Sequence, residues 1–165
     1  MTARARAAAG SLVFLVVAPG VVAGLVPWLL TGWDANGASR AAVVVGWLLI
    51  GLGAAVLLSA FARFVLEGLG TPAPVAPSER LVVGGLYRYV RNPMYLAVAA
   101  VIVGQALVLG RPVLIAYAAL FLVVVASFVH WYEEPVLGRR FGEQYERYRR
   151  AVPGWRPRRH PWEPR

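Results

Sequence analysis

The sequence predicts an all-α polytopic membrane protein with about four transmembrane helices and a C-terminal amphipathic helix at the membrane interface. Of the 165 residues, 59% are hydrophobic and the mean hydropathy is +0.60, whereas soluble domains are roughly half apolar. Four stretches carry no charged residue and approach or exceed the length that crosses a bilayer. They are residues 11–31, 41–62, 94–110 and 112–129.

Length and composition narrow the classes of protein further. A chain of this length predicts one membrane domain over residues 1–165. There is no cysteine, and His130 and His160 are the only histidines, so we expect neither disulfides nor a metal site. The net charge is +9 and all 17 basic residues are arginine. Because they flank apolar spans, we expect an anionic membrane surface as partner and no nucleic acid.

The stretch 11–31 is the first predicted span. Arg4 and Arg6 precede it, so a signal peptide is the competing interpretation. The apolar region is longer than that of a signal peptide and further spans follow, which favours a transmembrane helix. Pro19-Gly20 and Pro27 predict kinks, which membrane helices tolerate.

The second span, 41–62, leads into a long connection. Gly46, Gly51 and Gly53 put small residues where another helix can approach closely. The connection 68–92 holds four glycines and three prolines. A connection this long in a small chain is typically functional or disordered. Hydrophobic residues and tyrosines from Leu81 onward argue against disorder in this loop.

The third and fourth spans, 94–110 and 112–129, are joined by the tight turn Arg111-Pro112. So short a connection makes them antiparallel neighbours. Pro93 suits the first turn of a helix and Asn92 suits its N-cap. The N–H groups of such a turn can hold an anion. The competing interpretation is an ordinary capped helix with an arginine-rich flank.

Arginine placement predicts the orientation. The N-terminal segment, the loop 68–92 and the tail 130–165 carry most arginines, and the opposite face holds only Arg40 and Arg111. The positive-inside rule puts both termini and the loop in the cytoplasm. We therefore expect an integral protein of a bacterial inner (plasma) membrane.

The tail predicts an interfacial helix. Apolar and tyrosine residues recur there at intervals of four, four and three, which is one helical face: Leu137, Phe141, Tyr145 and Tyr148. We expect this face to lie at the cytoplasmic membrane interface. Prolines after residue 152 end regular helix, and Trp155 and Trp162 are expected anchors at the headgroups.

Glu133 and Glu134 follow the fourth span, where carboxylates facing lipid are costly. Since the last two spans are antiparallel neighbours, the segment from Asn92 to Tyr95 is predicted to lie near this pair. A pocket there combines anion-binding N–H groups with carboxylates, which suits a zwitterionic ligand. Alternatively, the carboxylates only end the span and are neutralised by Arg88 or Arg91.

Two motifs resemble one family. The stretch Gly85-Leu-Tyr-Arg-Tyr-Val-Arg-Asn-Pro-Met-Tyr95 resembles the Arg-His-Pro-x-Tyr signature of integral membrane methyltransferases. These are the isoprenylcysteine carboxyl methyltransferases and the phospholipid N-methyltransferases. The pair Glu133-Glu134 and the later Phe141-Gly-Glu-x-Tyr-x-x-Tyr148 also resemble theirs. The resemblance covers roughly residues 68–157.

The resemblance implies an S-adenosyl-L-methionine-dependent methyltransferase that acts at the cytoplasmic face. The acceptor is expected to be a lipophilic, membrane-resident molecule, methylated on O or N. The implied cofactor-binding residues are Glu79, Arg80, Leu81, Val82, Tyr87, Asn92, Pro93, Met94, Tyr95, Glu133 and Glu134. Arg91 and His130 are expected to contact the substrate. If an amine is methylated, either glutamate or a tyrosine is open as the base.

Two departures from the family pattern bear on the chemistry. Asn92 stands where histidine is usual, and its amide cannot take a proton at neutral pH. Val129 and His130 occupy the region where isoprenylcysteine enzymes carry an arginine, so a prenylcysteine carboxylate substrate is not supported. The main alternative is a non-catalytic scaffold or lipid-binding protein with the same fold. A sterol-type reductase is disfavoured, because it needs a nicotinamide cofactor and more spans.

Overall fold

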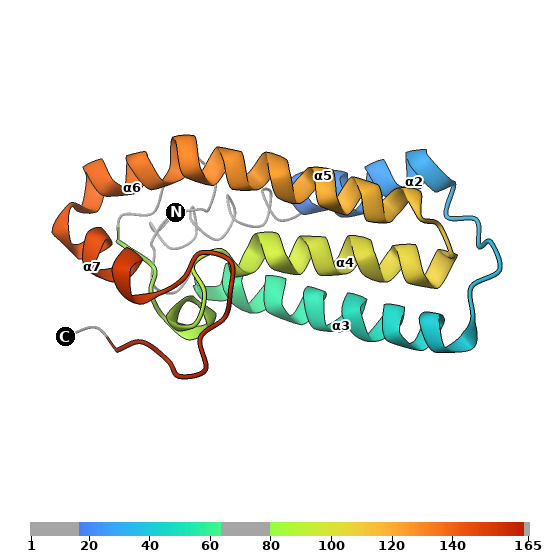
Figure 1. Cartoon of the computed structure of the whole chain (residues 1–165), viewed down its shortest axis with the longest axis horizontal. Coiled ribbons are helices and arrows are strands. Elements are labelled where there is room, and N and C mark those ends of the chain that lie inside the picture. The colour runs from blue at the N-terminus through green and yellow to red at the C-terminus, as the bar shows by residue number, and fades with distance from the viewer. Residues whose placement is uncertain (1–16, 64–79, 164–165) are drawn as a thin grey trace, which may run out of the picture.

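The computed structural model describes residues 17–63 and 80–163, and these are helical without any strand. Figure 1 shows long helices lying side by side, with short helices and an extended C-terminal segment gathered at one end. Several predictions fall outside the described residues. They concern Arg4, Arg6, the start of the first span at 11–16, the loop up to residue 79, and Glu79 as a cofactor contact.

The first helix runs over Val17–Thr31, with a π-helical turn η1 at Val21–Leu25 followed by α2 at Val26–Thr31. Helix α3 is Arg40–Arg63, α4 is Pro93–Leu109 and α5 is Val113–Phe128. A 3₁₀ turn η3, Gly85–Arg88, precedes α4. Helix α5 continues through a π-turn η4, Val129–Glu133, into α6, Glu134–Phe141, and α7 is Glu143–Ala151.

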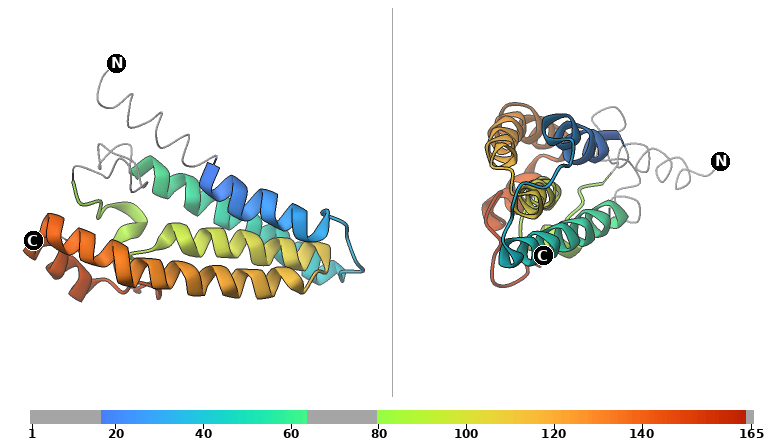
Figure 2. Two further views of the ribbon diagram at one scale, coloured as in Figure 1. Left: turned by 90° about the horizontal axis from the view of Figure 1, so that it is seen from above. Right: turned by 90° about the vertical axis from the view of Figure 1, so that its right-hand side faces the viewer.

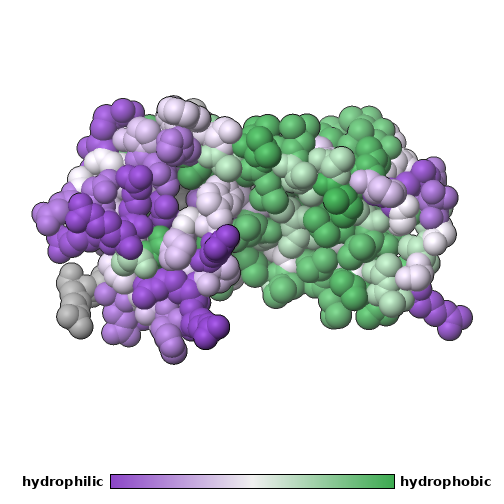
Figure 3. Space-filling model, in the orientation of Figure 1, coloured by the Kyte–Doolittle hydropathy of each residue, from purple (hydrophilic) through white to green (hydrophobic). Residues whose placement is uncertain are grey.

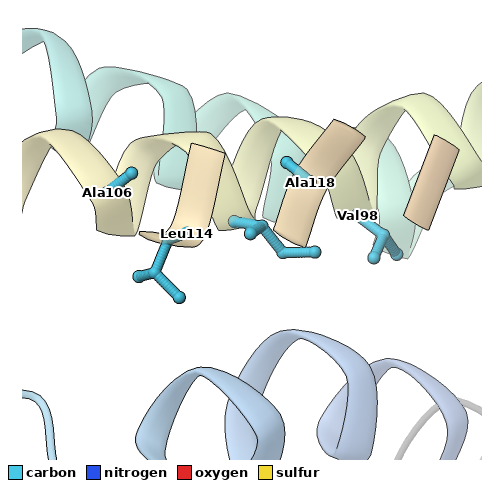
Figure 4. Close-up of a cluster of buried hydrophobic side chains, with 5 residues drawn as sticks. Val98, Ala106, Leu114 and Ala118 are labelled. Carbon is cyan, nitrogen blue, oxygen red and sulfur yellow. The ribbon is translucent and has the colours of Figure 1, made fainter. Parts of the chain in front are cut away.

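Helix α4 lies between its neighbours, packed against α3 on one side and α5 on the other (Figures 1 and 2). Five buried residues form the core between α4 and α5: Val98, Ile102, Ala106, Leu114 and Ala118. Figure 4 labels four of them, Val98, Ala106, Leu114 and Ala118. The turn between α4 and α5 is as tight as predicted. Gly110 ends α4 in the left-handed conformation at φ +64°, and Leu114 N–H donates to the Arg111 carbonyl.

Two described helices are long and apolar enough to cross a membrane: α3 and the continuous helix Val113–Phe141. Each has an apolar window with a mean hydropathy of 2.5, of which only 11% in α3 and 22% in the second helix is buried inside the bundle. The other two predicted spans correspond to shorter apolar helices, Val17–Thr31 and Pro93–Leu109. Figure 3 shows a hydrophobic band over the bundle and hydrophilic residues at its ends, which supports a membrane location.

Glycines set the contact between α3 and α4. A Cβ atom at Gly46 would lie 2.6 Å from the Gly104 carbonyl oxygen, and one at Gly53 would lie 2.8 Å from the Ala97 carbonyl oxygen. The two backbones therefore touch, with the helices antiparallel. The predicted close approach is confirmed for Gly46 and Gly53, whereas Gly51 faces open space.

At Pro27, where a kink is predicted, the helix contains the π-turn η1 immediately upstream, in which Val26 N–H donates to the Val21 carbonyl. Pro27 has no N–H to offer the carbonyls of the preceding turn. Side chains of two other helices donate to these carbonyls instead. Gln105 Nε2 donates to the Ala23 carbonyl at 2.7 Å, and Tyr117 Oη donates to the Val22 carbonyl at 2.9 Å. Polar side chains thus tie the first helix to α4 and α5.

The C-terminal region corrects two predictions. The amphipathic helix is divided at Gly142, whose φ is +52°, into α6 and α7. Tyr145 and Tyr148 are only 2% and 3% exposed, because Leu81, Val83 and Trp162 pack against the tyrosine cluster. The expectation that Tyr145 and Tyr148 face the headgroups is therefore wrong, since the chain's own loop and tail cover them. The location of α6, α7 and Trp162 at the membrane interface stays a prediction.

Candidate functional site

The site lies at the end of the bundle where α4 begins and α5 passes into α6. We call residues 152–163 the strap, because this extended segment runs back along the loop before α4 (Figure 1). Arg91 N–H donates to the Pro153 carbonyl at 2.9 Å and Asn92 N–H to the Gly154 carbonyl at 3.3 Å. Further along, the strap N–H groups of Arg158 and Trp162 donate to the carbonyls of Tyr89 and Arg88.

Glu133 closes the π-turn η4 and faces the first turn of α4. Tyr95 Oη donates a hydrogen bond of 2.8 Å to Glu133 Oε1. The ring of Tyr95 stacks on Trp155 of the strap, with ring centroids 6.4 Å apart. Among the described residues no arginine forms an ion pair with Glu133, so this carboxylate has only a neutral partner.

Glu134 has a different environment. Its Oε1 lies 2.6 Å from Arg91 Nη1 and its Oε2 lies 3.5 Å from Arg149 Nε. The side chains of Glu134 and Arg91 are each 14% exposed. Arg91 also donates from Nη1 to Tyr145 Oη at 3.1 Å and from Nε to the Val152 carbonyl at 2.9 Å. Arg91 therefore joins the loop, α6, α7 and the strap, and together with Arg149 it neutralises Glu134.

Asn92 is the N-cap residue of α4 and Pro93 occupies the first turn, as predicted. However, the side chain of Asn92 makes no capping hydrogen bond. Its Nδ2 donates instead to the Gly154 carbonyl at 3.2 Å. The side-chain capping prediction is wrong because the strap brings a carbonyl oxygen to this amide.

Several predicted cofactor residues form packed clusters. Val82 and Tyr87 are buried with Ala60 of α3, and Met94 packs against them. Leu81 packs on the tyrosines of α7. Burial raises the pKa of the Tyr87 phenol, so it stays protonated at neutral pH.

Tyr148 links α7 to this cluster. Its Oη donates to the Tyr87 carbonyl at 2.7 Å, and burial raises the pKa of Tyr148 far above its ordinary value. Burial also raises the pKa of Tyr145, although the adjacent Arg91 lowers it. Both phenols therefore remain protonated at neutral pH, and Tyr148 serves as a hydrogen-bond donor that fastens α7 to the loop.

The structure does not bring all predicted residues together. Arg80 and His130 are exposed. The His130 ring contacts Trp131 edge-on at 4.7 Å, and no contact with the Arg91 network is present in the described residues. Within residues 17–63 and 80–163, no group of three or more His, Asp or Glu side chains is placed to hold a metal ion.

Sequence reasoning missed three members of the site: Tyr145, Arg149 and Trp155. The sequence pattern places Tyr145 and Trp155 at the membrane surface and predicts no role for Arg149. For Trp155, the signal that could have revealed it is the spacing of Pro153, Pro157 and Pro161. Prolines at this spacing exclude a helix and leave an extended segment able to fold back on the loop.

An apolar helical bundle with a network of carboxylates, arginines and tyrosines at one end defines a helical membrane protein with a polar site. The family model described as phospholipid methyltransferase matches residues 41–144. The chain belongs to the phospholipid methyltransferase family, which is a family of membrane methyltransferases. Searches of curated proteins and of solved structures gave no match. The match includes Tyr95, Glu133 and Glu134 but ends before the strap.

Proposed function

We propose that the protein is an S-adenosyl-L-methionine-dependent methyltransferase that modifies a lipophilic, membrane-resident acceptor on O or N at the cytoplasmic face. The observation that carries the proposal is the convergence of Tyr95 with Glu133 and of Arg91 with Glu134 at one end of an apolar bundle. These residues come from the two motifs that define the resemblance.

The two glutamates have separate roles in this proposal. Glu133 has one neutral hydrogen-bond partner, which contacts only its Oε1, so its second carboxylate oxygen is available for a ligand amino group or ribose hydroxyls. Glu134 is held by Arg91 and Arg149 and acts as a positioning residue. The same argument makes Arg91 a positioning residue rather than a substrate contact, because its guanidinium is engaged within the chain.

The reaction is an in-line displacement. A lone pair on the acceptor oxygen or nitrogen forms a bond to the methyl carbon while the carbon–sulfur bond breaks, which leaves S-adenosylhomocysteine. Holding the reactants in line supplies much of the acceleration. An amine acceptor must also lose a proton, and Glu133 is the carboxylate available to take it, since Glu134 is ion-paired. Asn92 cannot serve as this base.

The membrane arrangement completes the proposal. Four spans with both termini in the cytoplasm of a bacterial inner membrane place the arginine-rich end inside. The exposed apolar surface of α3 and α5 faces lipid acyl chains. An acceptor with an acyl or prenyl tail then reaches the site laterally from the membrane.

Reconstituted protein supplied with methyl-labelled S-adenosylmethionine and a lipid extract tests the proposal. We expect label in the lipid fraction with the wild type and at least a tenfold lower rate with Glu133→Gln. Folded wild-type protein that neither binds the cofactor nor labels any lipid would contradict the proposal and favour a non-catalytic scaffold.

A further inference from the structure

One guanidinium nitrogen of the strap residue Arg158 is buried without a hydrogen-bond acceptor in the described part of the chain, although the residue as a whole is partly exposed. Nη1 of Arg158 is fully buried, and it has no hydrogen-bond acceptor among the described residues. A guanidinium N–H in that situation has lost its water without gaining an acceptor, which is unfavourable. An oxyanion brought to this nitrogen would relieve that cost.

The backbone fixes this side chain to the loop that leads into the site. Arg158 N–H donates to the Tyr89 carbonyl at 2.9 Å, and Tyr89 is three residues before Asn92. The neighbouring Arg88 is already engaged, since its Nε donates to the Trp162 carbonyl and its Nη2 contacts Glu163 at 3.1 Å. Of these two arginines, Arg158 is the one with a buried nitrogen that has no acceptor among the described residues.

The local charge favours an anion. Arg88 and Arg158 lie on paired segments, and Glu163, 79% exposed, is the acidic side chain that contacts this pair of segments. Within the strap, Arg156 and Arg159 add further positive charge. A planar guanidinium matches the two oxygens of a carboxylate or phosphate.

We propose that Arg158 binds an oxyanion of the ligand and is a specificity-determining residue contributed by the strap. The inference rests on the proposed function and extends it beyond the matched family segment 41–144. The oxyanion is either the carboxylate of the cofactor or the phosphate of a lipid headgroup, and the two sources are separated by experiment.

The experiment compares Arg158→Gln with Arg159→Gln in the full chain. Arg159 is exposed, so its variant matches the loss of charge without removing the buried donor. The first arm titrates S-adenosylhomocysteine and its decarboxylated analogue. The second arm titrates dioleoylphosphatidic acid and dioleoylglycerol in neutral detergent.

If the cofactor carboxylate is the anion, Arg158→Gln weakens S-adenosylhomocysteine binding at least tenfold and leaves binding of the decarboxylated analogue unchanged. If the lipid phosphate is the anion, the same loss falls on phosphatidic acid and spares dioleoylglycerol. Arg159→Gln changes neither. Equal affinities of the two variants for every ligand in both arms would overturn the inference. It would also be overturned if Arg158→Gln weakened binding of the decarboxylated analogue as much as binding of S-adenosylhomocysteine.

Wild-type protein that does not bind S-adenosylhomocysteine would count against the proposed function, while the lipid arm would still report on Arg158.

A second variant, Arg158→Lys, retains the positive charge but not the planar guanidinium that can donate to two oxygens. If Arg158→Gln does not fold, a several-fold loss in Arg158→Lys supports the inference and wild-type affinity in both arms contradicts it.

Discussion

Glu133 and Glu134 are adjacent, but they face different partners because successive helical residues point in different directions. Glu133 accepts from the neutral Tyr95 phenol, whereas Glu134 lies between Arg91 and Arg149. Removing one member of a buried ion pair costs about 3–5 kcal/mol, and the 14% exposure of both side chains suggests the lower end of this range.

Substitution of each glutamate by glutamine should therefore have a different effect. Glu134→Gln leaves Arg91 without its anion, so we expect a clear fall in the unfolding temperature, with cofactor affinity lost as a consequence. Glu133→Gln retains an oxygen that can accept from Tyr95, so the free energy of unfolding should change by less than about 1 kcal/mol, while cofactor affinity falls tenfold or more. Thermal unfolding in detergent and calorimetric titration measure the two effects. If the two variants had the same unfolding temperature and the same cofactor affinity, the separate roles of Glu133 and Glu134 would be refuted.

At the scale of elements, the bundle depends on contacts between helices whose backbones touch or share polar groups. The contact of α3 with α4 depends on Gly46 and Gly104, and the first helix depends on Gln105 for its free carbonyl. Both contacts hold α4 in place, and α4 carries Tyr95 to the site. Helix α4, which positions Tyr95 in the site, is therefore held by contacts that lie several helical turns away from Tyr95.

A methyl group added between α3 and α4 should be costly. In Gly104→Ala the new Cβ would lie 2.6 Å from the Gly46 carbonyl oxygen, and such overpacking costs about 1–3 kcal/mol. Gly51→Ala is the matched control, because this position on α3 faces open space. We expect a lower unfolding temperature for the first variant and no decrease for the second. Equal stability of both would show that the helices do not pack as described.

Loss of the Gln105 amide should loosen the first helix. Gln105→Leu removes the donor to the Ala23 carbonyl and the acceptor for Trp33 Nε1. Interhelical hydrogen bonds in membranes contribute about 0.6–2 kcal/mol, so we expect a decrease of that size in the free energy of unfolding. Ser127→Ala removes only a bond within α5 and should have no measurable effect. A larger effect of the serine variant would contradict this account.

How much the sequence predicts differs between elements. Hydropathy locates α3 and the helix after Val113 because apolar spans need only composition and length. The short Arg111-Pro112 turn predicts that Glu133 and Tyr95 meet. The strap escapes prediction, because its pairing with residues 88–92 uses backbone groups, which leave no periodic pattern of side chains. The sequence also cannot decide whether Arg88 or Arg91 pairs with Glu134, because that depends on how the loop before α4 folds.

At the scale of the whole molecule, polarity is separated along the bundle. The end with α6, α7 and the strap is rich in arginine, while the opposite end holds Arg40 and Arg111. A hydrophobic band lies between them (Figure 3). Under the positive-inside rule, this separation predicts that the site faces the cytoplasm.

Single cysteines test this orientation cleanly, because the chain contains no cysteine of its own. Ala35 and His160 are exposed at opposite ends of the bundle. We expect A35C to react with a membrane-impermeant thiol reagent in spheroplasts, and H160C to react only after the membrane is permeabilised. The reverse pattern would place the site outside the cytoplasm.

The most direct measurement of the central claim is a calorimetric titration of S-adenosylmethionine and S-adenosylhomocysteine into the detergent-purified full chain. The account predicts dissociation constants in the micromolar range for the wild type and tenfold weaker binding for Glu133→Gln. Folded protein that binds neither compound in several lipids and detergents would contradict the account. The network around Glu133 and Glu134 would then be structural, and the protein would be a scaffold with a methyltransferase fold.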